Sequence, residues 1–365
     1  MSFEKGTTAL SIFRLPEKLP ENALELFAMK AAIPYQDTGS EECLGWVSGR
    51  HLLERRIDEE TAICGGHYYV NLRITQRKVP PVLLAAECRM VELQYMQENG
   101  TDFVPAKIKR EIKENIQKER IKQMPPSLSG IPMVYDRSSS MLYIGTASNK
   151  AIDTFSAFFR DTFGMEPIQV TFEDIMIRQF EETPDSLPAV NFSENNSEND
   201  FMPGRDFFTW LWYFNEKKKG TIKLDTYGSF ITGIDGPLFL ALVDDTEGGA
   251  GETVVKKGVP QRSAEVKAAL LGGKKLKKAK IVFVRGENIW TGMFNADEFT
   301  ISGLSMPDGE EMEPHSAFAE RVNFLHMFHL ALEELVRTYI SSVKSDSWED
   351  EQKEIYKWVA EREAV

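Results

Sequence analysis

The chain has 365 residues, of which 42% are hydrophobic and 27% are charged, and it contains only 3 cysteines. This composition is typical of a globular protein and excludes a collagen, a coiled-coil rod and a wholly disordered chain. The cysteines form no CxxC pair, so we expect neither a disulfide framework nor a zinc site. No run approaches the roughly 18 apolar residues of a membrane helix, and the first residues do not resemble a signal peptide. We therefore expect a cytoplasmic protein with no membrane partner.

Charge is divided unevenly along the chain. The net charge is −13, yet residues 104–123 carry +4 and residues 254–285 carry +9, which leaves −26 on the remainder. This division predicts one basic surface that attracts polyanions and an acidic remainder that keeps the protein soluble. The alternative is that the lysines form only a solvated face. Mixed Lys and Glu leave this alternative open for 104–123, whereas Glu265 is the single acidic residue of 254–285.

The first half of the chain alternates strands with helices, which predicts the α+β class. The helices at 82–97 and 105–123 have a narrow apolar stripe, so we expect them to form a protruding helical hairpin. Several prolines in 124–132 are expected to exclude regular structure there. In chain order, we expect strands at 9–15, 45–47, 67–75, 132–136, 141–146 and 167–172, with further helices at 21–32 and 149–163.

The second half begins after a polar, acidic segment at 182–206, which we interpret as a linker. A helix at 207–214, a helix at 263–271 and a long amphipathic helix at 315–342 are predicted from apolar spacing. We expect strands near 221–232, 237–243, 252–257, 279–285 and 289–303. The predicted organisation is a central α+β domain (1–79 and 131–181), a helical tip (80–130), the linker, a base domain (207–343) and a charged C-terminal tail (344–365).

Motifs for catalysis are absent from the sequence: there is no GxxxxGK[ST], HExxH or GxSxG, and no GxGxxG opening a helix. Residues 248–251 are glycine-rich but lie between acidic residues, so we expect a hairpin rather than a phosphate site. His326 and His329 have a metal-ligand spacing, but no Glu or Cys completes the set, and a structural pair is favoured. Asp235, Asp244 and Asp245 are expected in loops. These observations predict no enzyme activity, no metal and no cofactor.

The order of landmarks along residues 1–343 resembles the RdgC family, the recombination-associated DNA-binding proteins of bacteria. The match is loose residue by residue, and the succession of motifs carries it. Those motifs are Ile12-Phe13-Arg14-Leu15, Gly45-Trp46-Val47, Leu72-Arg73 with Arg77-Lys78-Val79-Pro80, Val134-Tyr135-Asp136, Lys150-Ala151-Ile152-Asp153, and Gly273-Lys274 before Leu276, Lys278 and Phe283.

The resemblance implies a ring-shaped homodimer through which DNA passes, with tips meeting tips and bases meeting bases. It implies binding to DNA with little sequence preference, duplex better than single strands, and restraint of RecA-driven strand exchange without catalysis. The expected location is the cytoplasmic nucleoid, and any effect on RecA would act through shared DNA. The two basic segments would then line the hole, because phosphate contacts need Lys and Arg on that surface only.

Individual positions carry over as expectations. Arg77 matches a basic position at the root of the tip, Lys256 and Lys257 match a lysine pair in the base, and Lys274 and Lys278 match the lysines of a Gly-Lys-x-x-x-Lys run. Leu128 stands where the family has an aromatic residue at the tip-to-tip contact, and leucine buries less area. The remaining residues that we expect to contact DNA are Lys78, Lys107, Lys109, Arg110, Lys113, Lys275 and Lys277.

Two other classes of function remain open at this stage. One is a protein-interaction scaffold whose basic surface docks an acidic partner, and it predicts little affinity for DNA at physiological salt. The other is a hydrolase with an unrecognised site, and it requires a pocket with convergent carboxylates and histidines. The sequence offers no such constellation.

Overall fold

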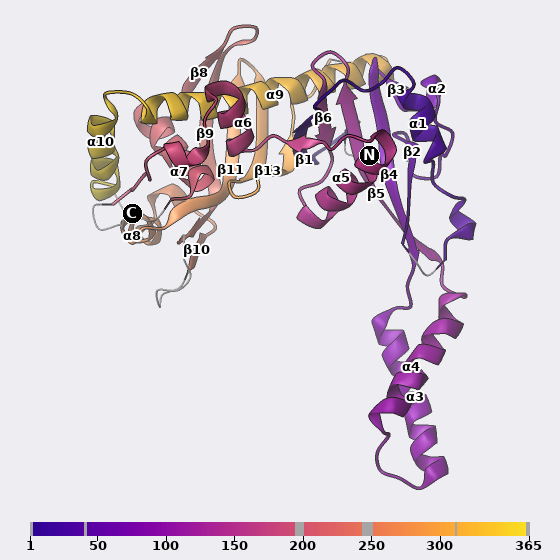
Figure 1. Cartoon of the computed structure of the whole chain (residues 1–365). Coiled ribbons are helices and arrows are strands. Elements are labelled where there is room, and N and C mark those ends of the chain that lie inside the picture. Colours follow the sequence, from indigo (N-terminus) through magenta and orange to yellow (C-terminus); the bar gives the residue numbers. More distant parts are fainter. Residues whose placement is uncertain (1–2, 40–41, 194–200, 243–250, 311, 363–365) are drawn as a thin grey trace.

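The computed structural model describes residues 3–39, 42–193, 201–242, 251–310 and 312–362. The fold is α+β, as the alternation of elements predicts. Figure 1 shows two lobes side by side beneath one long helix, α9, and a helical hairpin that projects far from one lobe. We call the lobes central and base, and the hairpin, formed by α3 and α4, the tip.

The central lobe packs helices against an antiparallel sheet. The strand order β1-β6-β5-β4-β2 places β4 and β5 side by side over their full lengths, and beyond the lobe the two continue as a ribbon into the tip. Its elements are β1 (Thr8–Arg14), α1 (Ala23–Met29), β2 (Cys43–Ser48), α2 (Glu59–Ala62), β3 (Ile63–Cys64), β4 (His67–Arg77), β5 (Pro126–Asp136), β6 (Met141–Ile144), α5 (Asn149–Phe163), β7 (Ile168–Gln169) and α6 (Phe172–Phe180).

The base lobe continues the same sheet in the order β10-β9-β11-β12-β13. Its elements are α7 (Pro203–Lys217), β8 (Thr221–Leu224), β9 (Gly228–Ala241), β10 (Glu252–Val255), α8 (Ala264–Leu271), β11 (Lys275–Arg285), β12 (Asn288–Asn295), β13 (Thr300–Ser305), α9 (Pro314–Val343) and α10 (Trp348–Ala360). Single 3-10 turns lie at Tyr35–Asp37, Pro184–Ser186 and Pro260–Arg262.

Strand β1 joins the two lobes. Its first half pairs with β13 of the base lobe, and its second half pairs with β6 of the central lobe. Helix α9 spans both lobes: Phe318 near its start lies 4.7 Å from the Tyr69 ring, whereas Tyr339 near its end packs on Trp210 of α7. The shared sheet and the shared helix fix the orientation of the lobes.

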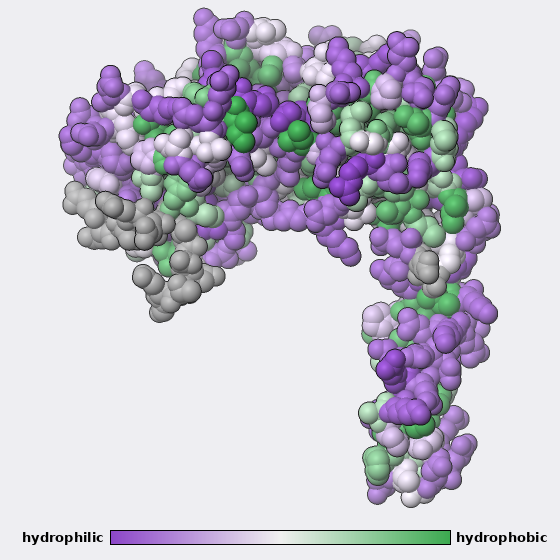
Figure 2. Space-filling view, viewed as in Figure 1, coloured by the Kyte–Doolittle hydropathy of each residue, from purple (hydrophilic) through white to green (hydrophobic). Residues whose placement is uncertain are grey.

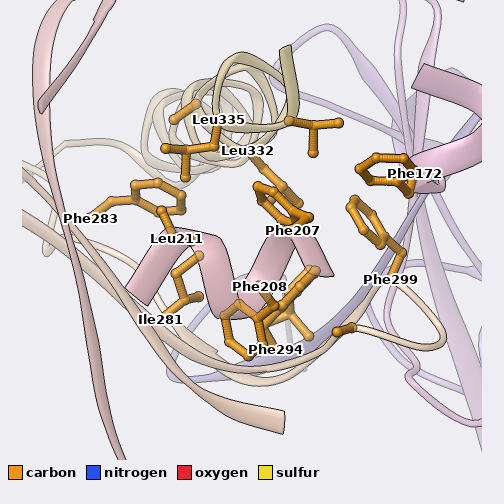
Figure 3. Close-up of a cluster of buried hydrophobic side chains, with 14 of the residues drawn as sticks. Phe172, Phe207, Phe208, Leu211, Ile281, Phe283, Phe294, Phe299, Leu332 and Leu335 are labelled. Atoms are coloured by element: carbon orange, nitrogen blue, oxygen red, sulfur yellow. The ribbon is translucent and has the colours of Figure 1, made fainter. Parts of the chain in front are cut away.

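The core of the base lobe is built on α7, whose predicted aromatic helix is confirmed. Figure 3 shows Phe207, Phe208 and Leu211 of this helix between the sheet and α9. Sheet residues such as Phe294, 5.0 Å from Phe208, cover one side, and Leu332 and Leu335 cover the other. Burial on both sides explains why this helix is apolar around most of its circumference.

Three expectations about regular structure are corrected. Residues 126–132 are not irregular but form the first part of β5. Pro126 is the first residue of the strand, and Pro132 is paired opposite Asn71, where its carbonyl oxygen still accepts a hydrogen bond from the backbone N–H of Gly145. The segment predicted as a strand at 167–172 is mostly replaced by the short β7 and the start of α6. Asp235 lies in β9 rather than in a loop.

Two segments expected outside the folded domains are packed against them. In the described part of the 182–206 segment, Leu187, Val190 and Phe192 are buried, so this part is not a free linker. The expected tail forms α10, which buries Ile355, Trp358 and Val359 against the base lobe. Within the described residues, no helix is both long and apolar enough to cross a membrane.

Candidate nucleic-acid interface

The tip is an antiparallel pair of helices, α3 (Pro81–Asn99) and α4 (Ala106–Ile121). Gly100 ends α3 in a left-handed conformation (φ 59°), which a residue without a side chain adopts at little cost. Ion pairs stitch the helices together: Arg120 lies 2.8 Å from Glu87, and Lys109 lies 4.0 Å from Glu92. This hairpin confirms the predicted protrusion.

The basic residues expected on the tip are exposed. Lys107, Lys109, Arg110 and Lys113 all lie on the solvent side of α4. Arg110 pairs with Glu114 one turn on, at 3.0 Å, so part of its charge is compensated. In the portion of the chain that the structure describes, Lys107 and Lys113 form no ion pair. Of these four side chains, Lys107 and Lys113 are therefore the more available to a polyanion.

Arg77 lies at the root of the tip and holds three backbone segments together by hydrogen bonds. Its guanidinium donates hydrogen bonds to the carbonyl oxygens of Thr38 (2.7 Å), Gln36 (3.1 Å) and Met124. These bonds tie the end of β4 to the loop before β2 and to the end of the tip. Arg77 thus has a positioning role in this structure, and the neighbouring Lys78 is exposed.

The structure corrects the expectation for Lys275. Its side chain is fully buried, and its ammonium group lies 2.5 Å from a carboxylate oxygen of Asp206, whose side chain is 1% exposed. Burial raises the pKa of Asp206 to about 6, and the charge of Lys275 opposes that shift. This lysine stabilises the packing of β11 on α7 and does not face a ligand.

The other base lysines reach the surface to different degrees. Lys256 and Lys257, just after β10, are exposed. Lys274, Lys277 and Lys278 are half-buried. Lys274 donates to the hydroxyl of Thr253 at 2.8 Å, and Lys277 lies 3.9 Å from Asp297. The expected cluster is therefore distributed over several environments rather than forming one patch.

The tip and β10 project from the same side of the two lobes (Figure 1). Figure 2 shows the open hollow that they flank, and most of the visible surface that faces it is hydrophilic. Helices α3 and α4 lie on one flank of this hollow, and β10 lies on the other (Figure 1). Lys107, Lys109, Arg110 and Lys113 belong to α4, and Lys256 and Lys257 directly follow β10 in the chain.

Leu128 does not lie in the helical hairpin. It is 38% exposed and pairs with Thr75 in the β4–β5 ribbon, at the root of the tip. At the far end of the hairpin, the exposed aromatic residue is Phe103, which is 70% exposed. The position inferred from the resemblance is thus distant from the end of the tip.

The apolar stripe expected on α3 is present, but much of it is exposed, which the spacing of its residues alone does not predict. Val82, Met90 and Leu93 are 82%, 57% and 49% exposed. With Ala86 they recur at intervals of four and three residues, and so they share one face of the helix. The sequence carried this signal, because α3 has more apolar residues than one contact with α4 can bury.

His326 and His329 belong to a polar network where the lobes meet. His329 Nε2 lies 3.0 Å from Glu333, which also accepts a hydrogen bond from Arg178 of α6. Burial raises the pKa of Glu333, but the hydrogen bonds from His329 and Arg178 outweigh it and lower that pKa to about 2. His326 lies 3.3 Å from the Tyr143 hydroxyl, and burial lowers its pKa.

Metal ligation finds no support in this network. Among the described residues, no group of three or more His, Cys, Asp or Glu side chains is arranged to hold a metal ion. Asp244, Asp245 and the glycines at 248–250 lie outside the described residues.

No protein-family model matches the chain, and no curated protein sequence matches it.

Proposed function

We propose that this protein binds DNA with little sequence preference, as a homodimer that encloses the duplex, and that it acts without catalysis. The single observation that carries the proposal is that exposed cationic residues are concentrated in α4 and directly after β10, the elements that flank the hollow, on a chain whose net charge is −13. Attraction to phosphates needs Lys and Arg on one surface only, and an acidic remainder limits misplaced docking.

The shape supports enclosure by two copies. One chain supplies two lobes in a row and one long projection that extends away from them (Figure 1). Two such chains related by a twofold axis would bound a hole if their projections and their base lobes met. The exposed stripe of Val82, Met90 and Leu93 on α3 gives the projection an apolar face to bury in that contact.

Occupation of DNA by such a ring would restrain RecA-driven strand exchange by blocking access rather than by contact with RecA. A strand-exchange assay measures this effect. Inhibition that disappears when competitor duplex is added in excess is the expected result, and inhibition that persists would point to direct contact with RecA.

The experiment that tests DNA binding is fluorescence anisotropy with labelled duplexes of two unrelated sequences over a salt series. Lys107→Ala/Lys113→Ala should weaken binding equally for both sequences and reduce the slope of log K against log salt by about 0.9 for each lost phosphate contact. The matched control is Lys353→Ala/Lys357→Ala, which removes two exposed lysines from α10 at the opposite end of the molecule.

A protein-interaction scaffold is the alternative, and the same experiment separates the two. Wild-type protein that binds neither duplex at about 50 mM salt would exclude the DNA proposal, because electrostatic binding is strongest at low salt. The exposed lysines would then be assigned to a surface that docks an acidic protein.

A further inference from the structure

Phe239 lies on the sheet of the base lobe, on the face opposite to the core. Its neighbours in β9, Leu238 and Leu240, are both buried, whereas Phe239 is partly exposed. Side chains alternate between faces along a strand, so the ring of Phe239 points away from the core. Among the described residues, no other aromatic ring packs against it.

The strand register surrounds this ring with lysines. Phe239 pairs with Lys278 of β11 on one side and with Val254 of β10 on the other. The ammonium groups of Lys256 and Lys278 lie 5.7 and 6.0 Å from the ring centroid. Lys278 belongs to β11 and Lys256 follows β10, so the two side chains reach the same ring from different strands.

The charge near the ring is uncompensated among the described residues, where neither Lys256 nor Lys278 forms an ion pair. The next carboxylate along β9 is Asp235, which is opposite Lys280 in the register rather than opposite Lys278. Its Oδ1 already accepts from the backbone N–H of Gly236 at 2.8 Å. On β10, Glu252 lies two residues before Val254 and shares this face of the sheet, opposite Ala241. The two ammonium groups are the charges that the structure places next to the ring itself.

We propose that Phe239, Lys256 and Lys278 form a stacking site for an unpaired base of single-stranded nucleic acid, with the two ammonium groups on the flanking phosphates. The inference rests on the proposed DNA-binding function and adds a site at which an unpaired base would be held. The two ammonium groups lie over the ring, and a base that stacks on its π-face would displace them towards the phosphates that flank this base. In an intact duplex the bases already stack on each other, so the ring contributes little there.

The test compares Phe239→Ala with wild type on three labelled probes: a 20-nucleotide oligo-dT, an abasic strand of equal length and a 20-base-pair duplex. Loss of one stacked base should weaken the binding of oligo-dT by a factor of about five or more. Binding of the abasic strand and the duplex should change by less than two-fold. The salt slope should be unchanged, because the ring carries no charge. Phe239→Trp should retain binding of oligo-dT.

The matched control is Ile231→Ala, which removes an exposed apolar side chain (55% exposed) from the same strand. If Phe239→Ala fails to fold, ultraviolet cross-linking of oligo-dT to the wild-type protein, followed by peptide mapping, gives an independent readout. Cross-links within β9 at Phe239 are expected.

Equal binding of oligo-dT by Phe239→Ala and wild type would overturn the inference, as would cross-links confined to other segments. A loss that is equal for all three probes would also overturn it, because it would indicate a structural role. Failure of wild-type protein to bind either duplex or single strand would instead refute the proposed function itself.

Discussion

Replacement of Lys275 should destabilise the fold rather than weaken DNA contacts directly. Lys275 and Asp206 have side chains that are 0% and 1% exposed, and the ammonium nitrogen is 2.5 Å from the carboxylate oxygen. Lys275→Met removes the ammonium group and leaves the carboxylate of Asp206 buried without its partner. Breaking a buried ion pair in this way costs about 3–5 kcal/mol, a large part of the stability of an ordinary domain.

Urea denaturation followed by tryptophan fluorescence measures this cost, because Trp210 and Trp212 lie on α7, the helix that carries Asp206. Lys274→Met is the matched control: this lysine is half-buried and donates to one hydroxyl, so its loss should cost about 1 kcal/mol. Lys275→Met/Asp206→Leu should recover much of the stability, since a well-packed apolar pair can replace a buried ion pair.

The reasoning is refuted if Lys275→Met lowers the free energy of unfolding by less than about 1 kcal/mol or no more than Lys274→Met does. Lys275 should therefore be left unchanged in variants that are designed to test DNA binding. A glutamate at position 275 would face Asp206 in a buried site, so lost DNA binding in that variant would report unfolding and not a lost contact.

Above pH 5, Glu333→Gln should lower the free energy of unfolding by about 3 kcal/mol, because the ionised carboxylate, whose pKa is lowered, stabilises the fold. The difference from wild type should shrink as the pH falls from about 5 towards 2 and the carboxylate becomes protonated. A difference that does not depend on pH in urea melts would contradict this. Arg362→Ala should lower the free energy of unfolding by about 2 kcal/mol and increase hydrogen exchange in α10, because the Arg362 guanidinium stacks 4.1 Å from the Trp212 ring centroid and donates to Glu216. Unchanged exchange in α10 would show that Arg362 does not hold this helix in place. Leu93→Glu should shift the protein from dimer to monomer in sedimentation velocity with no change in thermal stability, whereas a dimer as tight as wild type would exclude the α3 stripe from the interface.

Much of the secondary structure could be predicted because its apolar spacing is regular. The helix expected at 149–163 is observed as Asn149–Phe163, and the helix expected at 315–342 is observed as Pro314–Val343. In both, an apolar face repeats every three to four residues over several turns. The protruding hairpin also followed from a narrow apolar stripe.

The long-range pairing could not be predicted. Strand β1 joins two lobes because its halves pair with strands almost 300 residues and about 130 residues distant in sequence, β13 and β6. Local periodicity contains no information about such partners. For the same reason 182–193 and α10 were expected outside the domains: their few apolar residues are buried by segments distant in sequence.

The candidate site was predicted only in outline. A run of lysines at 274–278 suggested one patch, but the register of β11 shifts between Leu276 and Lys278, and Lys275 points inward to Asp206. The sequence does not reveal that pairing, because Asp206 belongs to an acidic segment 69 positions earlier. Phe239 was also missed, since an aromatic residue in a strand is far more often core than surface.

DNA binding by this protein is best measured as the affinity of purified protein for two unrelated 30-base-pair duplexes between about 50 and 300 mM salt. We predict equal affinities for the two sequences and a steep linear decrease of log K with log salt, shallower for Lys107→Ala/Lys113→Ala and unchanged for Lys353→Ala/Lys357→Ala. No binding at the lowest salt, or binding that is independent of salt, would contradict the claim.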